Sequence, residues 1–117
     1  MKYNQRDLVW LKEPTELPDG TKLDHPVLLI SCLAANTKEN YYTAVMMTAS
    51  THTDMFSFKL DNTMFEGHLE KADCQFRMYI ILAIREAKID RLANKMKKIH
   101  FENLIKQIKD YVLAVDN

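Results

Sequence analysis

The sequence predicts a mainly β protein of the α+β class, with a small, strongly curved antiparallel sheet or barrel followed by helices. Short β-rich runs alternate with polar breaks over residues 1–86. None of these breaks could hold a long helical crossover, so neighbouring strands must run mainly antiparallel. The last third of the chain changes to a helical spacing of apolar residues. We therefore expect the 117 residues to form one domain, with a barrel of five to seven strands over residues 1–86 and a helical C-terminus over 87–115.

The individual strands follow from composition and alternation. Residues 12–24 hold two of the three prolines and one of the two glycines, so we expect a long loop there. Pro26 can begin a strand but cannot occupy its centre, and the almost continuously apolar run after it predicts burial on both faces of the sheet. We expect strands at residues 7–11, 27–33, 41–50, 55–60 and 74–84, with turns at 34–40 and 51–54.

Two helical segments are expected near the C-terminus. Apolar residues recur at i, i+3, i+4 and i+7, the spacing of an amphipathic helix. They are Ile89, Leu92, Ala93, Met96 and Ile99. The apolar stripe restarts out of phase at Phe101, so we expect a break near residues 99–101. A basic stripe accompanies the first segment and consists of Lys88, Arg91, Lys95 and Lys98.

Composition narrows the class of protein. The formal net charge is zero, but residues 88–109 carry seven basic and two acidic residues, a net charge of +5 that is compatible with an anionic partner. No apolar run reaches the roughly 18 residues of a membrane span. The N-terminus lacks the apolar core of a signal peptide. We therefore expect a cytoplasmic protein with no membrane association.

Most signatures of enzymes and metal sites are absent. Gly20 and Gly67 are the two glycines of the chain, which excludes a glycine-rich phosphate loop and a dinucleotide-binding fingerprint. Cys32 and Cys74 lie in apolar stretches, and no histidine accompanies them at metal-ligand spacing. We expect both thiols to be buried, and we expect neither a metal nor a cofactor.

Polar side chains instead gather near the ends of predicted strands, where a curved sheet can bring them together. They are His25, Ser31, Thr48, Ser50, Gln75 and Arg77. A histidine can accept or donate a proton near neutral pH, and an arginine and hydroxyls can stabilise phosphate oxygens. This set of side chains is better suited to act on a phosphodiester than on a carbonyl group. Each member also has a structural interpretation, since His25 can be a surface turn residue and Arg77 can pair with an acid such as Asp73.

Taken in order along the chain, these features resemble the MazF/PemK family of toxin ribonucleases from bacterial toxin–antitoxin pairs. The family opens with a strand close to G-D-I-V-W-V, matched by RDLVWL at residues 6–11. A loop and a strand beginning R-P-x-L-V-L-S follow, matched by HPVLLIS at 25–31. An I-T-S-like turn is matched by MTAS at 47–50, and a later Q-x-R by QFR at 75–77. The resemblance covers nearly the whole chain.

The resemblance implies an SH3-like barrel that forms a homodimer, cuts single-stranded RNA without metal and is blocked by a cognate antitoxin protein. Its catalytic pair corresponds to His25 and Thr48. The residues that would contact RNA are Ser31, Ser50, Gln75 and Arg77. Candidates for stacking on bases are Trp10, Phe56 and Phe76, although core packing is expected for most of these.

Two positions depart from the family pattern. Arg6 stands where the family usually has glycine, which removes a permissive backbone position. His25 stands where the family has arginine, and a histidine exchanges protons readily whereas an arginine is a fixed charge with five donors. The replacement could keep acid–base chemistry, with Arg77 supplying the lost charge, or it could mark a member that cuts slowly or not at all.

Two other functions remain open. A toxin of the same fold that inhibits a protein target such as gyrase would use the C-terminal residues of the chain and would not need His25. A nucleic-acid-binding module that does not cut would use the basic stripe, and its affinity would fall steeply with salt.

Overall fold

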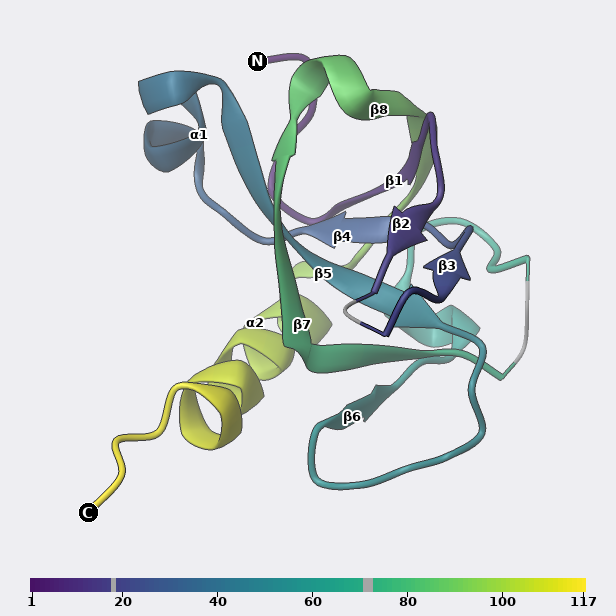
Figure 1. The fold of residues 1–117 in the computed structure, drawn as a ribbon, viewed down its shortest axis with the longest axis vertical. Helices are drawn as coiled ribbons and strands as arrows, with labels where there is room; N and C mark the ends of the chain where they lie inside the picture. The colour runs from purple at the N-terminus through teal and green to yellow at the C-terminus, as the bar shows by residue number, and fades with distance from the viewer. Residues whose placement is uncertain (18, 71–72) are drawn as a thin grey trace.

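A computed structural model of the chain, drawn in Figure 1, describes residues 1–17, 19–70 and 73–117. The strands are β1 (Asp7–Leu11), β2 (Thr15–Glu16), β3 (Lys22–Leu23), β4 (Val27–Leu29), β5 (Tyr41–Thr48), β6 (Ser57–Lys59), β7 (Gln75–Arg85) and β8 (Ile89–Lys95). The helices are α1 (Leu33–Glu39) and α2 (Lys98–Gln107). Short helical turns lie at Asn62–Met64, at Glu86–Lys88 and, directly after α2, at Ile108–Val112.

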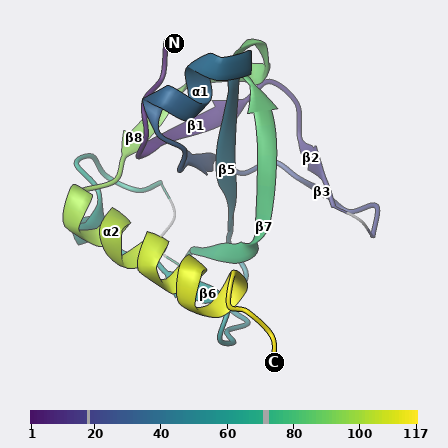
Figure 2. The same ribbon diagram turned by 90° about the vertical axis from the view of Figure 1, so that its left-hand side faces the viewer.

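Six of the strands form one antiparallel sheet in the order β6-β7-β5-β4-β1-β8, and β2 pairs with β3 in a separate hairpin. The longest strand, β7, bends sharply in its first half (Figures 1 and 2). The bend follows from the pairing of β5 with β7, which passes from Val45–Ile81 to Met46–Arg77 and so skips residues 78–80 of β7. The predicted mainly β, curved antiparallel architecture is confirmed.

Apolar side chains form two clusters, one on each face of the central strands. Leu28 of β4 belongs to the first cluster, whereas Val27 and Leu29 belong to the second, and all three are fully buried. The predicted burial of this strand on both faces is therefore confirmed. Helix α2 packs beside the sheet (Figure 2) and contributes Phe101 and Leu104 to the first cluster.

The prediction of a helix over residues 89–99 is wrong in its first part, because residues 89–95 form strand β8, paired with β1. The pairing shifts register twice, and the apolar residues that carry the helical spacing do not share one buried face of the strand. Ile89 and Met96 are buried, but Leu92 is 54% exposed. Helix α2 begins at Lys98, so the boundary of the helical C-terminus also moves from residue 87. No helix in the described part of the chain is long and apolar enough to cross a membrane.

Two connections also differ from the prediction. Residues 33–39, expected to continue a strand and then turn, form helix α1, since they include helix-favouring Leu and Ala residues and end at Asn40 with a left-handed φ of 59°. Strand β4 consequently stops at Leu29, and Cys32 is exposed rather than buried as expected. Cys74 is buried as predicted. The loop expected over residues 12–24 contains the small β2–β3 hairpin.

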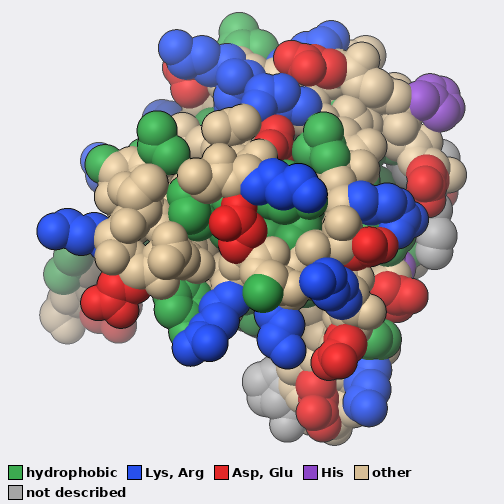
Figure 3. Space-filling model, turned by 90° about the horizontal axis from the view of Figure 1, so that it is seen from above, with side chains coloured by type: hydrophobic (Ala, Val, Ile, Leu, Met, Phe, Trp, Pro, Cys, Tyr) green, Lys and Arg blue, Asp and Glu red, His purple; other side chains and the backbone are tan. Residues whose placement is uncertain are grey.

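The predicted basic stripe does not form one helix face. Arg91 and Lys95 lie on β8, whereas Lys98 begins α2. Lys95 pairs with the buried Asp7 at 3.0 Å, and Arg91 pairs with Asp90. Figure 3 views one end of the molecule, and on this face blue cationic side chains alternate with red acidic ones. The positive charge of residues 88–109 is thus partly neutralised within the fold.

Arg6 occupies a conformation that ordinarily favours glycine, with φ at 78°. Its backbone holds β1 between two neighbours. Its N–H donates to the Leu29 carbonyl at 2.8 Å, and its carbonyl accepts from the Met96 N–H at 2.9 Å. The Arg6 guanidinium also donates to the Met96 carbonyl at 3.1 Å. The strained backbone is therefore fixed from both sides by the sheet and by the start of the C-terminal segment.

We expect the protein to be more stable with glycine than with alanine at position 6. In helices and strands the order is ordinarily the reverse. Both substitutions remove the Arg6 side-chain hydrogen bond, but only glycine relieves the left-handed strain of roughly 1–2 kcal/mol. The free energy of unfolding in urea should be about 1 kcal/mol higher for Arg6→Gly than for Arg6→Ala.

A matched pair at the exposed helical residue Glu102 should show the opposite order, because glycine weakens a helix interior. If Arg6→Ala proved as stable as Arg6→Gly, the left-handed strain at position 6 would be refuted.

Candidate functional site

A pocket opens where β1, β4, β5 and β8 meet the segment between β6 and β7. We call it the His25 pocket. It is lined by Leu8, Trp10, His25, Pro26, Met47, Thr48, Ala49, His68, Leu69, Glu70, Cys74, Ala93 and Asn94. The pocket therefore contains both members of the predicted catalytic pair.

The strand register explains why His25 and Thr48 share this pocket. Val27 of β4 pairs with Met46 of β5 in an antiparallel ladder. Continuing the same register by two residues places His25 opposite Thr48, in the position of a cross-strand pair. His25 is half-buried just before the buried Pro26, and Thr48 is the last residue of β5.

The turn after β5 is tied back to Thr48 and to β7. The Thr48 hydroxyl oxygen accepts a hydrogen bond from the Ser50 N–H at 3.3 Å. The side-chain amide of the buried Gln75 donates to the carbonyls of Ser50 and His52, at 2.8 and 2.7 Å. Gln75 therefore holds the turn that carries Ser50, and its amide N–H groups are engaged by the protein itself.

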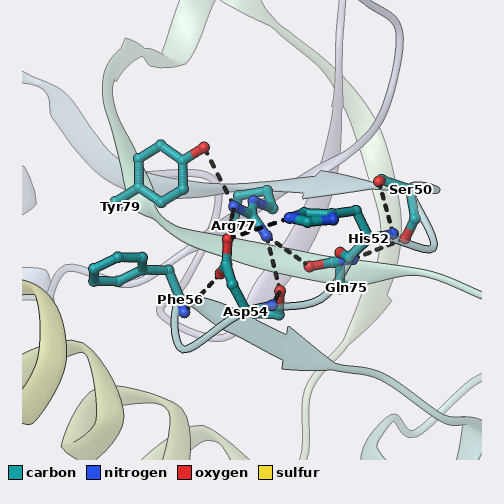
Figure 4. A network of polar contacts seen from close by, with 8 residues as sticks. Ser50, His52, Asp54, Phe56, Gln75, Arg77 and Tyr79 are labelled. Atoms are coloured by element: carbon teal, nitrogen blue, oxygen red, sulfur yellow. Dashed lines mark hydrogen bonds and ion pairs between the residues drawn. The ribbon is translucent and has the colours of Figure 1, made fainter.

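Arg77 belongs to a polar network beside the pocket, shown in Figure 4. Its guanidinium donates to the Asp54 carboxylate at 3.0 Å, to the Ser57 hydroxyl at 2.8 Å and to the Gln75 side-chain oxygen at 3.2 Å. It also stacks on the Tyr79 ring at 5.0 Å. Gln75 and Arg77 thus face the same side of β7 as predicted, but the acid that Arg77 pairs with is Asp54 rather than Asp73.

Electrostatics at this network favour the ionised pair. The hydrogen bond from Arg77 is the main cause that lowers the pKa of Asp54, and the Phe56 N–H contributes further. Burial acts to lower the pKa of Arg77, but its contacts with Asp54 and Tyr79 outweigh burial and raise it. Arg77 is consequently a fixed cation with a side chain only 12% exposed, held at the rim of the turn that follows Thr48.

Ser31 lies away from these groups, at the opposite end of β4 from His25. Its hydroxyl contacts the buried amide of Asn36 and accepts from the Thr43 N–H at 2.8 Å. These bonds dock α1 against β5. Contact of Ser31 with RNA stays a prediction, and its position in this structure is explained by the docking of the helix.

The three aromatic residues considered for stacking on RNA bases lie in different environments. Phe76 is fully buried in the core and is not available to stack on a base. Phe56 packs against Tyr79 edge to face, with 5.6 Å between ring centres. Trp10 is half-buried, lines the His25 pocket and lies 5.6 Å from the Arg91 guanidinium. Trp10 is therefore the aromatic side chain that the pocket offers.

Sequence reasoning missed three polar residues of the pocket, His68, Glu70 and Asn94. His68 and Glu70 lie in the connection between β6 and β7, and Asn94 was assigned to a helix. Their approach depends on the pairing of β8 with β1 and on contacts made by Asn94, neither of which has a local sequence signal. Among the described residues, no group of three or more His, Cys, Asp or Glu side chains is placed to hold a metal ion.

No family model matches the sequence, and no curated protein matches it significantly. Solved structures, by contrast, match along almost the whole chain. An endoribonuclease in complex with its cognate antitoxin, from a mycobacterial species, superposes with a TM-score of 0.69 at 10% identity, covering 98% of this chain and 99% of that one.

Two further solved structures match this chain over almost its whole length. A MazE–MazF complex from Deinococcus radiodurans has a TM-score of 0.71 at 13% identity, with 98% of this chain and 99% of that chain covered. The Mycobacterium tuberculosis toxin MazF-mt6 has a TM-score of 0.68 at 10% identity, with 95% and 100% covered. At these identities the likeness concerns the fold. The chain has the fold of the MazF/PemK-type toxins.

Proposed function

We propose that this chain is a metal-independent endoribonuclease toxin of a toxin–antitoxin pair, acting on single-stranded RNA in the cytoplasm. The observation that supports the proposal is that His25 and Thr48 line the same pocket of a MazF-type fold. In this proposal residues 1–117 act as one domain, two copies form a homodimer, and a cognate antitoxin protein is the inhibitory partner.

The chemistry assigned to the pair follows from the side chains. The His25 imidazole can take the proton of a ribose 2′-hydroxyl, so that the oxygen attacks the neighbouring phosphorus. The Thr48 hydroxyl can donate a hydrogen bond to a phosphate oxygen as negative charge develops there. Arg77 adds a fixed positive charge close to the turn after Thr48, while Gln75 and Ser50 maintain that turn.

Arg77 is the natural substitute for the arginine that His25 replaces. A histidine can move a proton but offers only one or two donors, whereas an arginine offers five donors and no proton exchange. In this chain the two tasks are divided between His25, which comes just before β4, and Arg77 on β7, and β5 lies between these two strands. Trp10 provides an apolar ring at the pocket on which a base can stack.

Cleavage of a mixed single-stranded RNA pool in EDTA is the direct test. We expect the wild type to cut, and His25→Ala to lower the rate by about 10²–10⁴-fold, as for the loss of a general acid or base. Thr48→Ala should also lower the rate, because a donor to the phosphate is lost. Circular dichroism should show that both variants fold.

Removal of residues 113–117 is the matched control for the competing protein-inhibitor function. These residues form an exposed end of the chain, and trimming them should leave RNA cleavage unchanged. Absence of any cut by the wild type, with toxicity lost only on trimming, would exclude the ribonuclease.

Binding of RNA should be tightened by Asp54→Asn. The Asp54 carboxylate occupies the Arg77 guanidinium, so a phosphate must compete with it for the same donors. We expect a gain in affinity of about two- to fivefold for RNA with 2′-O-methyl groups, which has no attacking hydroxyl, because an ion pair that is still partly exposed contributes little free energy. Fluorescence anisotropy at several salt concentrations measures this gain.

Asp110→Asn is the control, since it removes the same charge from the Lys106–Asp110 ion pair on α2 and the turn after it. If both variants tightened binding equally, the gain would come from net charge, and Arg77 would not be a phosphate contact.

A further inference from the structure

A second histidine lines the His25 pocket. His68 comes from the segment between β6 and β7 and shares the pocket with His25, Thr48 and Glu70. It is exposed, whereas His25 is half-buried. Nothing in the resemblance to the MazF/PemK family led us to expect an imidazole at this position.

The segment that carries His68 is held firmly against β8 and the residue after it. Asn94, itself buried, accepts from the Gly67 N–H at 2.8 Å and donates to the His68 carbonyl at 3.3 Å. Glu66 donates its N–H to the Lys95 carbonyl at 2.9 Å, and Phe65 pairs with Met96. A Cβ on Gly67 would lie 2.9 Å from the Asn94 side-chain oxygen, so a larger residue there would displace the Asn94 side chain. His68 is therefore positioned by the fold at the edge of the pocket.

Cleavage of RNA by its own 2′-hydroxyl needs two proton transfers. The 2′-oxygen loses its proton to a base and forms a bond to phosphorus. The bond from phosphorus to the 5′-oxygen then breaks, and that oxygen receives a proton from an acid, leaving a 2′,3′-cyclic phosphate and a 5′-hydroxyl. A single neutral imidazole cannot perform both transfers on opposite sides of the phosphorus at once, and neither Arg77 nor Thr48 readily gives up a proton near neutral pH.

We propose that His68 is the general acid that protonates the departing 5′-oxygen, while His25 accepts the proton of the 2′-hydroxyl. This inference rests on the proposed ribonuclease function and adds a catalytic residue to it. An exposed imidazole recovers its proton from solvent after each turnover, which suits the acid. The other titratable groups that line the pocket are Glu70 and Cys74, and a histidine is the side chain that ordinarily titrates near neutral pH.

The test compares two substrates of one sequence, ordinary RNA and RNA with sulfur in place of the bridging 5′-oxygen at the cleaved bond. A thiolate leaves without being protonated, so the sulfur substrate does not need the acid. We expect His68→Ala to lower the rate of cleavage of ordinary RNA by about 100-fold or more. The same variant should cleave the sulfur substrate at nearly the wild-type rate. His25→Ala should be slow on both substrates.

His100→Ala is the matched control, because His100 lies on α2 outside the pocket and should behave as wild type on both substrates. His68→Gln, which keeps polarity without proton transfer, should repeat the result of His68→Ala, and thermal unfolding should show that both variants fold. Wild-type cleavage of ordinary RNA by His68→Ala, or an equal loss on both substrates, would overturn the role of His68 while leaving the ribonuclease standing. If the wild type cut neither substrate, the ribonuclease function itself would fail, and the role of His68 with it.

Discussion

The antiparallel pairing of β5 with β4 on one side and β7 on the other determines where the candidate site lies. On one side of β5 the pairing with β4 leads back to His25, which shares a pocket with Thr48, and on the other side Gln75 pairs directly with Thr48. The strand is buried through most of its length, with Ala44 and Val45 fully covered. Because side chains alternate along a strand, a slip of one residue in either register would exchange core and pocket residues. The two clusters of the core therefore fix the geometry of the pocket.

The bulge of β7 provides the second constraint. Residues 78–80 are skipped by the pairing with β5, and the Met78 N–H donates instead to the Phe56 carbonyl at 3.0 Å. The bend lets the first three residues of β7 pair with β6 as well as with β5. It also delivers the Arg77 guanidinium to Asp54 in the turn between β5 and β6, so a backbone irregularity sets the position of the main cation beside the pocket. Such irregularities are common next to functional sites.

The sequence was most informative where local pattern and burial agree. The β4 run of Val27–Leu29 is apolar without interruption, and it is buried on both faces. Pro26 correctly marked its start, which is why His25 could be assigned to the strand end. The helical period was misleading at β8, because Leu92 and Ala93, which complete that period, are exposed on the strand and only Ile89 among its apolar residues is buried. Asn94 and His68 were missed for the same reason, since their meeting depends on tertiary pairing that no local period reveals.

The two departures from the family pattern have different physical consequences. Arg6 keeps the left-handed backbone for which glycine is suited, so its cost falls on stability while its hydrogen bonds keep the sheet and the start of the C-terminal segment together. His25 changes the chemistry available in the pocket, because it removes a fixed charge and adds a group that exchanges protons. The charge has a counterpart in Arg77, which the fold holds close by through Asp54, Ser57 and Gln75. In the proposed mechanism phosphate binding and proton transfer fall to different residues, and such a site can use a second histidine where an arginine-based site would have no need of one.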